Sequence, residues 1–424
     1  MQIVDDHGHR TRVRLLRPLA LRDFRLLWTG MTLSLIGDGV LLVALAWQAY
    51  QISNHPGAMA AVGVALTAPQ VGLVLLGGII SDRFERRFVM LTADVVRAGA
   101  LAGLAVASFS GALGLWHLVG FAVIYGAASA FFIPAFDALV PSIVPEEHLI
   151  GANALDQFVR PAALWLMGPA LGGLLVGFAG AGAAFAFDAV TFLVSAACLA
   201  RMTRLPPDRE EGMTVRTAVV ELREGFRFVR SQPWLWATFA AATFTYLLFL
   251  GPTEVLLPYL VRNELGGDAG DLGLILAGGG LAALAAALLI GQTGLPRRAM
   301  VFTYVVWSLA TLGVAAYGVA HSKWQAMAAA ALIGALETVG AVAWTTTKQR
   351  LVPTVLLGRV SSFDWFISIA LVPLSYALTA PAAAAWGARE TLVGAGVIGA
   401  GVTLAFLFLP GVRAPDRILE AVPA

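Results

Sequence analysis

The fold of this chain is decided by the stretch Gly78-Ile79-Ile80-Ser81-Asp82-Arg83-Phe84-Glu85-Arg86-Arg87-Phe88-Val89-Met90. It joins two apolar segments, residues 57–80 and 88–110, each of which is long enough to cross a lipid bilayer. Because the link between them is only a few residues long, the two helices must lie side by side and antiparallel. The link carries three arginines, and arginines in a short loop indicate the cytoplasmic side of a membrane.

The composition also indicates a membrane protein. The chain has 424 residues, of which 58% are hydrophobic and 13% charged, and its mean hydropathy is +0.79. A soluble domain is usually about 25% charged, so this chain needs an apolar solvent. The single cysteine, Cys198, excludes an intrachain disulfide, and the net charge of +2 gives no indication of a nucleic-acid partner.

Twelve apolar segments can be placed along the chain. They are residues 24–50, 57–80, 88–110, 116–138, 161–180, 183–201, 234–258, 271–292, 299–320, 324–347, 361–381 and 390–410. Of the 28 basic residues, 24 fall on the tails and on the connections that follow even-numbered segments. This asymmetry predicts that both termini are cytoplasmic. Residues 1–22 are Arg-rich without an apolar region, so we interpret them as a tail rather than a signal peptide.

The midpoint of the chain divides it into two halves. We predict a cytoplasmic N-terminal tail, a six-helix half, a cytoplasmic linker, a second six-helix half and a cytoplasmic C-terminal tail. Their bounds are 1–23, 24–201, 202–233, 234–410 and 411–424. Within the linker, Val215–Arg230 has apolar residues at helical spacing among arginines, which is typical of an amphipathic helix on the membrane surface. A solvated linker is the alternative.

An internal repeat supports the two halves. At a constant offset of 208 residues, Val144-Pro145 aligns with Val352-Pro353, and Asp156 aligns with Asp364. Both segments lead into the fifth helix of a half, so the repeat predicts two pseudo-symmetric units.

The opening stretch resembles the loop signature of the major facilitator superfamily, written G-x-L-a-D-r-x-G-r-k-x-x-l. The matching positions are Gly78, Asp82, Arg83, Arg86, Arg87 and Met90. Glu85 replaces the usual second glycine. The resemblance implies an all-α integral membrane fold of 12 transmembrane helices in two pseudo-symmetric six-helix halves.

The same resemblance implies a conformational latch, by which we mean contacts that hold the two halves together on the cytoplasmic side. It would place Asp82 against the start of the eleventh span, at Gly358. Arg86 or Arg87 would pair with Asp137 at the end of the fourth span. The alternative is that the arginines only enforce topology.

Gly168-Pro169-Ala170-Leu171-Gly172-Gly173 resembles the core of the antiporter motif, which marks exporters in this superfamily. Leu164 stands where the full motif has an upstream glycine, and the alternative is an ordinary tight packing face. Leu35-Ile36-Gly37-Asp38-Gly39 and Asp94-x-x-Arg97 are similar to the drug:proton antiporter branch, which holds macrolide efflux proteins and the enterobactin exporter.

Acids inside membrane segments are costly and are the first candidates for function. Asp38 lies 13 residues beyond Arg25, about 20 Å into the first span at about 1.5 Å per residue. Glu337 is also near the midplane, in the tenth span, and Glu254 lies in the outer part of the seventh. We expect these three acids to be proton-coupling or substrate-binding residues. Helix packing and solvation are the alternatives.

Other polar residues receive a structural interpretation from the sequence. Asp188 lies in the sixth span, which is peripheral in this fold by resemblance, so we expect it to be structural. Asp94 and Arg97 stand at i, i+3 and can pair, and we assign them to the cytoplasmic charge cluster. The sequence has no Walker loop, metal-ligand spacing or nucleophile elbow.

Together these features predict a secondary active efflux transporter in a bacterial inner membrane, not an enzyme. It would export a lipophilic or amphipathic small molecule by alternating access, coupled to proton antiport. An uncoupled or import-direction facilitator for a metabolite or lipid is the alternative. The expected partners are the small-molecule substrate, protons and the lipid bilayer, without nucleic acid, cofactor or metal, and we expect a monomer.

Overall fold

The computed structural model describes residues 14–204 and 215–421, and this part of the chain is helical throughout. The helices, in chain order, are η1 Arg14–Ala20, α1 Arg22–Ile52, α2 Pro56–Arg83, α3 Arg86–Phe109, α4 Leu115–Ile143, α5 Glu146–Pro161, η2 Ala162–Met167, α6 Gly168–Arg201, α7 Val215–Ser231, α8 Pro233–Gly251, η3 Pro252–Leu256, α9 Leu257–Asn263, α10 Ala269–Thr293, α11 Ala299–Gly318, α12 Lys323–Leu351, α13 Thr354–Ile369, α14 Val372–Trp386, α15 Ala388–Phe406 and α16 Ala414–Ala421. Of these, η2 and η3 are π-helical.

Within the described residues, eleven helices are long and apolar enough to cross a membrane. One of them, Phe158–Arg201, has 44 residues, about 66 Å of helix at about 1.5 Å per residue, which is about twice the thickness of a bilayer core. It breaks at Gly180, whose φ of 80° is incompatible with an α-helix and suits glycine. This helix is therefore long enough for two passes, and within residues 14–204 and 215–421 the eleven helices then account for the twelve passes that the sequence predicts.

The fifth span is predicted from residue 161, close to the Phe158 at which the candidate membrane span begins, but its helix starts earlier. The helix begins at Glu146, and the helix of the eleventh span begins at Thr354 rather than 361. The apolar run marks only the part of each helix inside the bilayer, whereas the helix continues into polar sequence. The two helical segments at these starts obey the repeat: Glu146–Pro161 and Thr354–Ile369 each have 16 residues and are offset by 208 at both ends.

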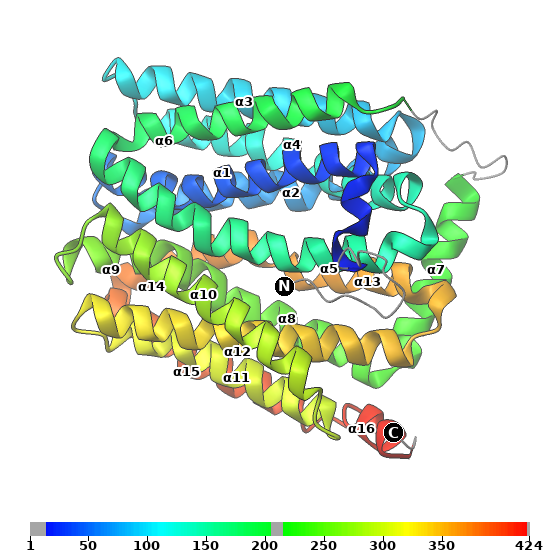
Figure 1. Ribbon diagram of the computed structural model, residues 1–424. Helices are drawn as coiled ribbons and strands as arrows, with labels where there is room; N and C mark the ends of the chain where they lie inside the picture. The colour runs from blue at the N-terminus through cyan, green and yellow to red at the C-terminus, as the bar shows by residue number, and fades with distance from the viewer. Residues whose placement is uncertain (1–13, 205–214, 422–424) are drawn as a thin grey trace, which may run out of the picture.

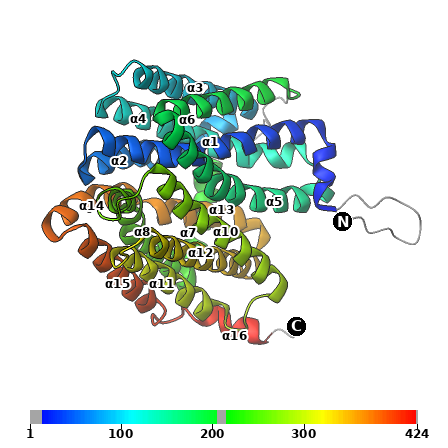
Figure 2. The same cartoon turned by 60° about the vertical axis from the view of Figure 1, so that its left-hand side comes forward.

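The bundle has two groups of helices, α1 to α6 and α8 to α15, which lie one above the other in Figure 1 and again in the rotated view of Figure 2. The amphipathic helix predicted in the linker is present as α7, and it runs across the ends of the other helices (Figure 1). Its Glu224 pairs with Arg359 of α13 at 3.1 Å, and Phe226 packs on Phe363 with ring centroids 5.9 Å apart.

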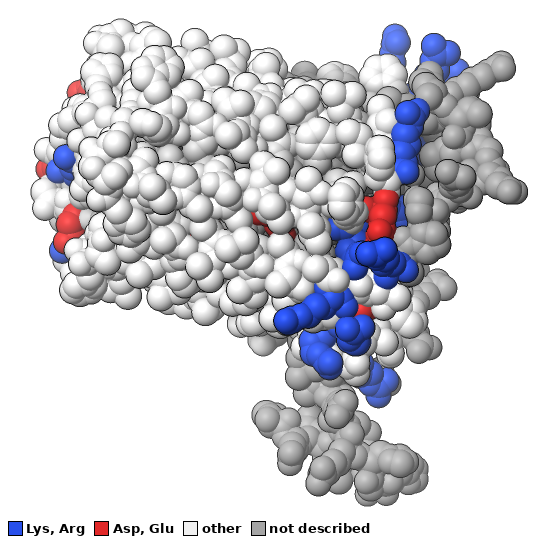
Figure 3. Space-filling view, turned by 90° about the horizontal axis from the view of Figure 1, so that it is seen from above, with Lys and Arg blue, Asp and Glu red and all other residues white. Residues whose placement is uncertain are grey.

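Charged side chains gather at the two ends of the molecule, with a nearly uncharged band between them (Figure 3). We call the end that carries η1 and α16 the termini side, and the opposite end the far side. Lysine and arginine predominate on the termini side in this view. A band of this kind matches the hydrocarbon core of a bilayer.

The two groups of helices contact each other on the far side. The Tyr50 hydroxyl of α1 donates a hydrogen bond to the Val255 carbonyl of η3, and Asn54 donates to Asn263 at 2.7 Å. These contacts close the far side between the halves.

Candidate functional site

Asp38 lies halfway along α1 and is half-buried. Its carboxylate accepts a hydrogen bond from the hydroxyl of Tyr125 on α4. Residues next to it on α1 are glycines, and this lets α6 pack closely against α1. The residue that the sequence singles out first therefore sits in a polar cluster between helices of the N-terminal half.

Arg97 and Asp94 of α3 belong to the same region. Arg97 donates to Asp94 at 2.7 Å, and Ser195 of α6 donates to the other Asp94 oxygen at 2.6 Å. The predicted pairing is confirmed, but the assignment to the cytoplasmic charge cluster is wrong. The side chains of Asp94 and Arg97 are 0% and 5% exposed, because α3 buries this face against α4 and α6. The Arg97 guanidinium lies 4.4 Å from the ring centroids of both Phe132 and Phe192.

The glycine and proline motif lies where α1, α6 and α10 meet. A side chain at Gly168 would come within 2.9 Å of the Gly39 backbone, and one at Gly172 would come within 2.9 Å of the Val40 carbonyl. Gly173 faces α10 of the other half, where a side chain would meet the Ala269 carbonyl at 2.9 Å. The motif thus packs the halves together, as small residues do in membranes.

Pro169 explains the π-helical turn before this motif. Proline lacks a backbone N–H and cannot donate to the preceding turn. The residues just before it, Ala162–Met167, form η2. A wider turn of this kind inside a helix is often found at functional sites.

Glu254 lies in η3 and belongs to the far-side closure. It accepts a hydrogen bond from the hydroxyl of Tyr376 on α14. The ring of Tyr376 occupies the space left by the missing side chain of Gly63 on α2 of the other half. This chain of contacts, from η3 through α14 to α2, links the two halves near the Tyr50 hydrogen bond to Val255.

We expect Tyr376→Phe to weaken this closure. The substitution leaves the Glu254 carboxyl without its donor, which costs about 1–3 kcal/mol in a buried position. The population with an open far side should rise by about tenfold. Distances between spin labels on the far-side ends of α2 and α14 report this change. Tyr317→Phe, at another buried tyrosine near the far side, is the control, and equal distance distributions in the two variants would contradict the expectation.

Glu337 lies on α12 and is half-buried. On either side of it, Gly334 packs on the backbone of Gly279 and Gly340 packs on Trp307. Asp38, Glu254 and Glu337 therefore have three separate sets of neighbours, and the structure does not bring them together.

The opening loop divides its arginines between different partners. Arg87 pairs with Glu85 at 2.9 Å and donates to the Met202 carbonyl at the end of α6 at 2.7 Å. Arg86 donates to the carbonyl of Ala138, next to Asp137, at 3.2 Å. The loop thus ties α3 to α4 and α6.

The other four residues of the predicted latch are Gly78, Asp82, Arg83 and Asp137. The side chain of Asp82 lies outside the part of the chain that the structure describes, and Arg83 is exposed. A side chain at Gly78 would meet open space. Asp137 lines a cavity of about 280 Å³ between α1, α4 and α5, together with Asp156.

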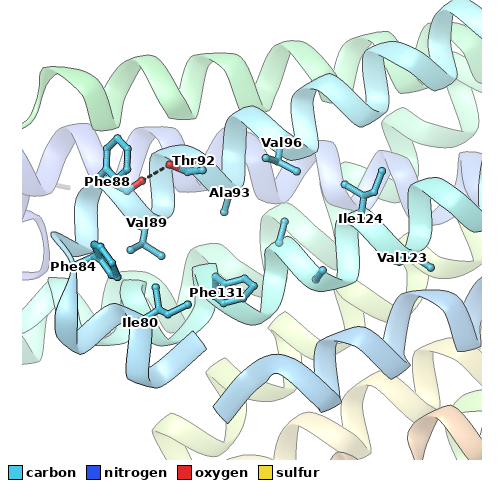
Figure 4. A pocket seen from close by; sticks show the side chains of 12 residues that line it. Ile80, Phe84, Phe88, Val89, Thr92, Ala93, Val96, Val123, Ile124 and Phe131 are labelled. Atoms are coloured by element: carbon cyan, nitrogen blue, oxygen red, sulfur yellow. Dashed lines mark hydrogen bonds between the residues drawn. The ribbon is translucent and has the colours of Figure 1, made fainter. Parts of the chain in front are cut away.

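A groove of about 500 Å³ lies between the ends of α2, α3 and α4, and its lining is almost entirely apolar (Figure 4). Phe84, Phe88 and Phe131 stand around it. Thr92 is the polar side chain of the lining, and its hydroxyl donates to the Phe88 carbonyl of its own helix at 2.9 Å. The groove therefore offers apolar contact and no charge.

Sequence reasoning missed Tyr125 as the partner of Asp38. A tyrosine in a membrane span is unremarkable by itself, and only the packing of α4 shows its role. Within residues 14–204 and 215–421, no group of three His, Cys, Asp or Glu residues could hold a metal ion.

Comparisons with known proteins agree with this architecture. Tap, a multidrug efflux pump of Mycobacterium tuberculosis, is 26% identical over 91% of this chain and 93% of its own length. Macrolide efflux protein A of Streptococcus pyogenes is 24% identical over 58% of this chain, and YfiS, an MFS-type transporter of Bacillus subtilis, is 25% identical over 63%. The matches to these last two span 60% and 63% of the relatives' own lengths.

Solved structures show the same fold. A bacterial homolog of the human lysosomal transporter Spinster, in an inward-facing and unoccupied conformation, superposes with a TM-score of 0.68 at 15% identity, over 98% of this chain and 100% of that one. The nucleoside transporter NupG gives a TM-score of 0.65 at 10% identity, over 95% and 100%. The family model described as transmembrane secretion effector matches residues 14–418. The chain therefore belongs to the transmembrane secretion effector family, and it has the fold of these solved transporters.

Proposed function

We propose that this chain is a secondary active exporter that moves a lipophilic or amphipathic small molecule out of the cell in exchange for protons. Basic side chains predominate on the termini side, so this side is cytoplasmic and the far side faces outward. The contacts between Tyr50 and Val255 and between Asn54 and Asn263 then close the outer side.

The observation that carries proton coupling is the position of Asp38. A carboxyl held among helices near the middle of the bilayer is costly when ionised, so it can hold a proton under conditions in which a surface carboxyl is ionised, and it can release that proton when its surroundings change. The Tyr125 hydroxyl can donate a hydrogen bond to the ionised carboxylate of Asp38. The site can therefore accommodate Asp38 in its ionised as well as its protonated form.

The antiporter-type motif supports the direction of transport. Gly168 and Gly172 let α6 lie against α1, which carries Asp38, while Gly173 lies against α10 of the other half. A change of protonation at Asp38 is therefore close to the surface on which the halves move against each other. The efflux pumps among its relatives favour export as well.

The composition of the membrane-spanning helices indicates the class of cargo. Charged residues inside the spans are few and aromatic residues are many, so the chain suits a moderately large apolar molecule better than a sugar or an amino acid. A macrolide is the first compound to test, because one relative is named for macrolide efflux. An uncoupled or import-direction facilitator remains the second candidate, because Glu254 and Glu337 lie apart from Asp38.

Two experiments test the proposal. Growth inhibition of an efflux-deficient host that expresses the chain, over a panel of macrolides and lipophilic dyes, identifies cargo. Everted membrane vesicles then measure transport: an exporter accumulates the cargo, and a proton antiporter stops accumulating it when an ionophore collapses the pH gradient. Accumulation that continues unchanged without the gradient would favour the facilitator.

We expect Asp82→Asn to shift the conformational balance toward the state open to the cytoplasm. The exposed N–H groups of α13 lie at its start, Thr354, rather than at Gly358 as the sequence predicts, and a carboxylate beside them would gain up to about 2 kcal/mol. Loss of this contact would change the ratio of the two conformational states more than tenfold if they are nearly equal in free energy. Spin-label distances between the cytoplasmic ends of α2 and α13 measure this shift. Unchanged distances would leave topology as the role of the loop.

A further inference from the structure

Asp188 of α6 lies directly against the turn of α1 that carries Asp38. Its side chain is fully buried, and its carboxylate fills the space where Gly37 has no side chain. A methyl group at residue 37 would collide with the Asp188 carboxylate and with the Thr191 hydroxyl. Because residue 37 is glycine, the Asp188 carboxyl lies against α1 one residue before Asp38. The charges of the two carboxyls act on each other there.

The one arginine in this cluster is already paired. Arg97 is bound to Asp94, and Ser195 completes the hydrogen bonds of that carboxylate. This pair is neutral as a whole. With Asp38 and Asp188 the cluster therefore has three carboxyls for one arginine, whose charge acts on Asp38 and Asp188 as well as on Asp94.

Neutral groups hold the two remaining carboxyls. The Tyr125 hydroxyl donates to Asp38, and the Thr191 hydroxyl lies 2.9 Å from Asp188 Oδ1. The other oxygen, Asp188 Oδ2, is buried and accepts no hydrogen bond within the part of the chain that the structure describes. A buried carboxylate oxygen without a donor is unfavourable, whereas a protonated carboxyl tolerates this position.

Charges on the other neighbouring helices do not change this balance. Arg160 of α5 acts on Asp38 from the termini side, but it pairs with Asp156 at 3.2 Å. On α10, Asp271 lies at the far-side end, where it pairs with Lys323 at 2.8 Å. Two like charges in such a buried site cannot both persist, so the two carboxyls hold at least one proton between them.

We propose that Asp188 is a second proton-binding residue and that it forms one carboxyl pair with Asp38. This proposal rests on the proposed proton coupling and replaces the structural role that the sequence suggests for Asp188. Asp188 is fully buried and Asp38 only half-buried, so protons enter and leave the pair through Asp38.

Infrared spectroscopy of the purified full chain in liposomes tests this without any cargo. The carbonyl stretch of protonated carboxyls is followed from mildly acidic to mildly alkaline pH in the wild type, Asp38→Asn and Asp188→Asn. We expect Asp188→Asn to remove one protonated-carboxyl band and to shift the titration of Asp38 to lower pH, because a neighbouring like charge is gone. Asp271→Asn, a carboxyl-to-amide change outside the cluster, should leave both bands unchanged.

Gly37→Ala provides a second variant. It keeps both carboxyls but pushes Asp188 away, so both bands should remain while Asp38 titrates as it does in Asp188→Asn. If Asp188→Asn keeps every protonated-carboxyl band and leaves the titration of Asp38 unchanged, the proposal is overturned. Failure of the proposed function is a different result, namely export in vesicles that does not respond to the pH gradient, whatever the infrared spectra show.

Discussion

Asp38→Asn should abolish gradient-driven export and leave the protein folded. The amide keeps the shape of the carboxyl and can still accept the hydrogen bond from Tyr125, but it cannot exchange a proton. Cargo accumulation in everted vesicles should fall to the level of vesicles without the protein. Cargo binding, measured by fluorescence of the purified variant, should persist because the amide has the size and shape of the carboxyl.

Asp271→Asn is the matched control for this substitution. It makes the same chemical change at the far-side end of α10, where Asp271 pairs with a partly exposed Lys323, and a surface pair of this kind contributes only about 0–1 kcal/mol. We expect wild-type export from it. Wild-type export by both Asp38→Asn and Glu337→Gln across the pH range would show that neither acid carries the coupling.

Gly168→Ala should produce the largest loss of stability among single methyl additions to α6. The added carbon would lie within 2.9 Å of the backbone of Gly39 and the carbonyl of Ile36, and backbone cannot move aside as a flexible side chain can. Overpacking of this kind costs about 1–3 kcal/mol or more. We expect a lower yield of monodisperse protein and a lower midpoint of thermal unfolding in detergent.

Gly177→Ala on the same helix is the control, because a side chain there would meet open space. It should unfold at the wild-type temperature or slightly above, since alanine favours a helix. Equal unfolding midpoints for the two variants would mean that α1 and α6 do not pack as closely as the structure has them.

Much of the fold follows from hydrophobicity alone. The apolar runs predict the passes, and the repeat from Val144-Pro145 to Val352-Pro353 predicts two related halves, in which the helical extensions α5 and α13 keep the same offset of 208 residues. The lengths of these extensions were not predictable from apolar runs, because a helix can continue beyond the bilayer into polar sequence. Gly180 gives no signal in the sequence that distinguishes it from the glycines around it.

The candidate site was less predictable. Depth along a span selects Asp38, because distance along a helix follows from residue number. The rotation of the helix about its axis does not follow from residue number. The contact of Asp38 with Tyr125 and the approach of Asp188 to Gly37 could therefore be found only in the packed structure. For the same reason Asp94 and Arg97 could be paired from their spacing but not placed in the interior.

Proton movement driven by a cargo gradient tests the central claim most directly. The purified chain is reconstituted into liposomes that contain a pH-sensitive dye, and a cargo found in the growth-inhibition panel is added on one side without any imposed pH gradient. Proton antiport predicts that protons cross the membrane in the direction opposite to the cargo, so that the pH of the lumen changes as cargo crosses. Asp38→Asn should remove this pH change. Cargo that crosses at the wild-type rate with no change in the pH of the lumen would contradict proton-coupled export.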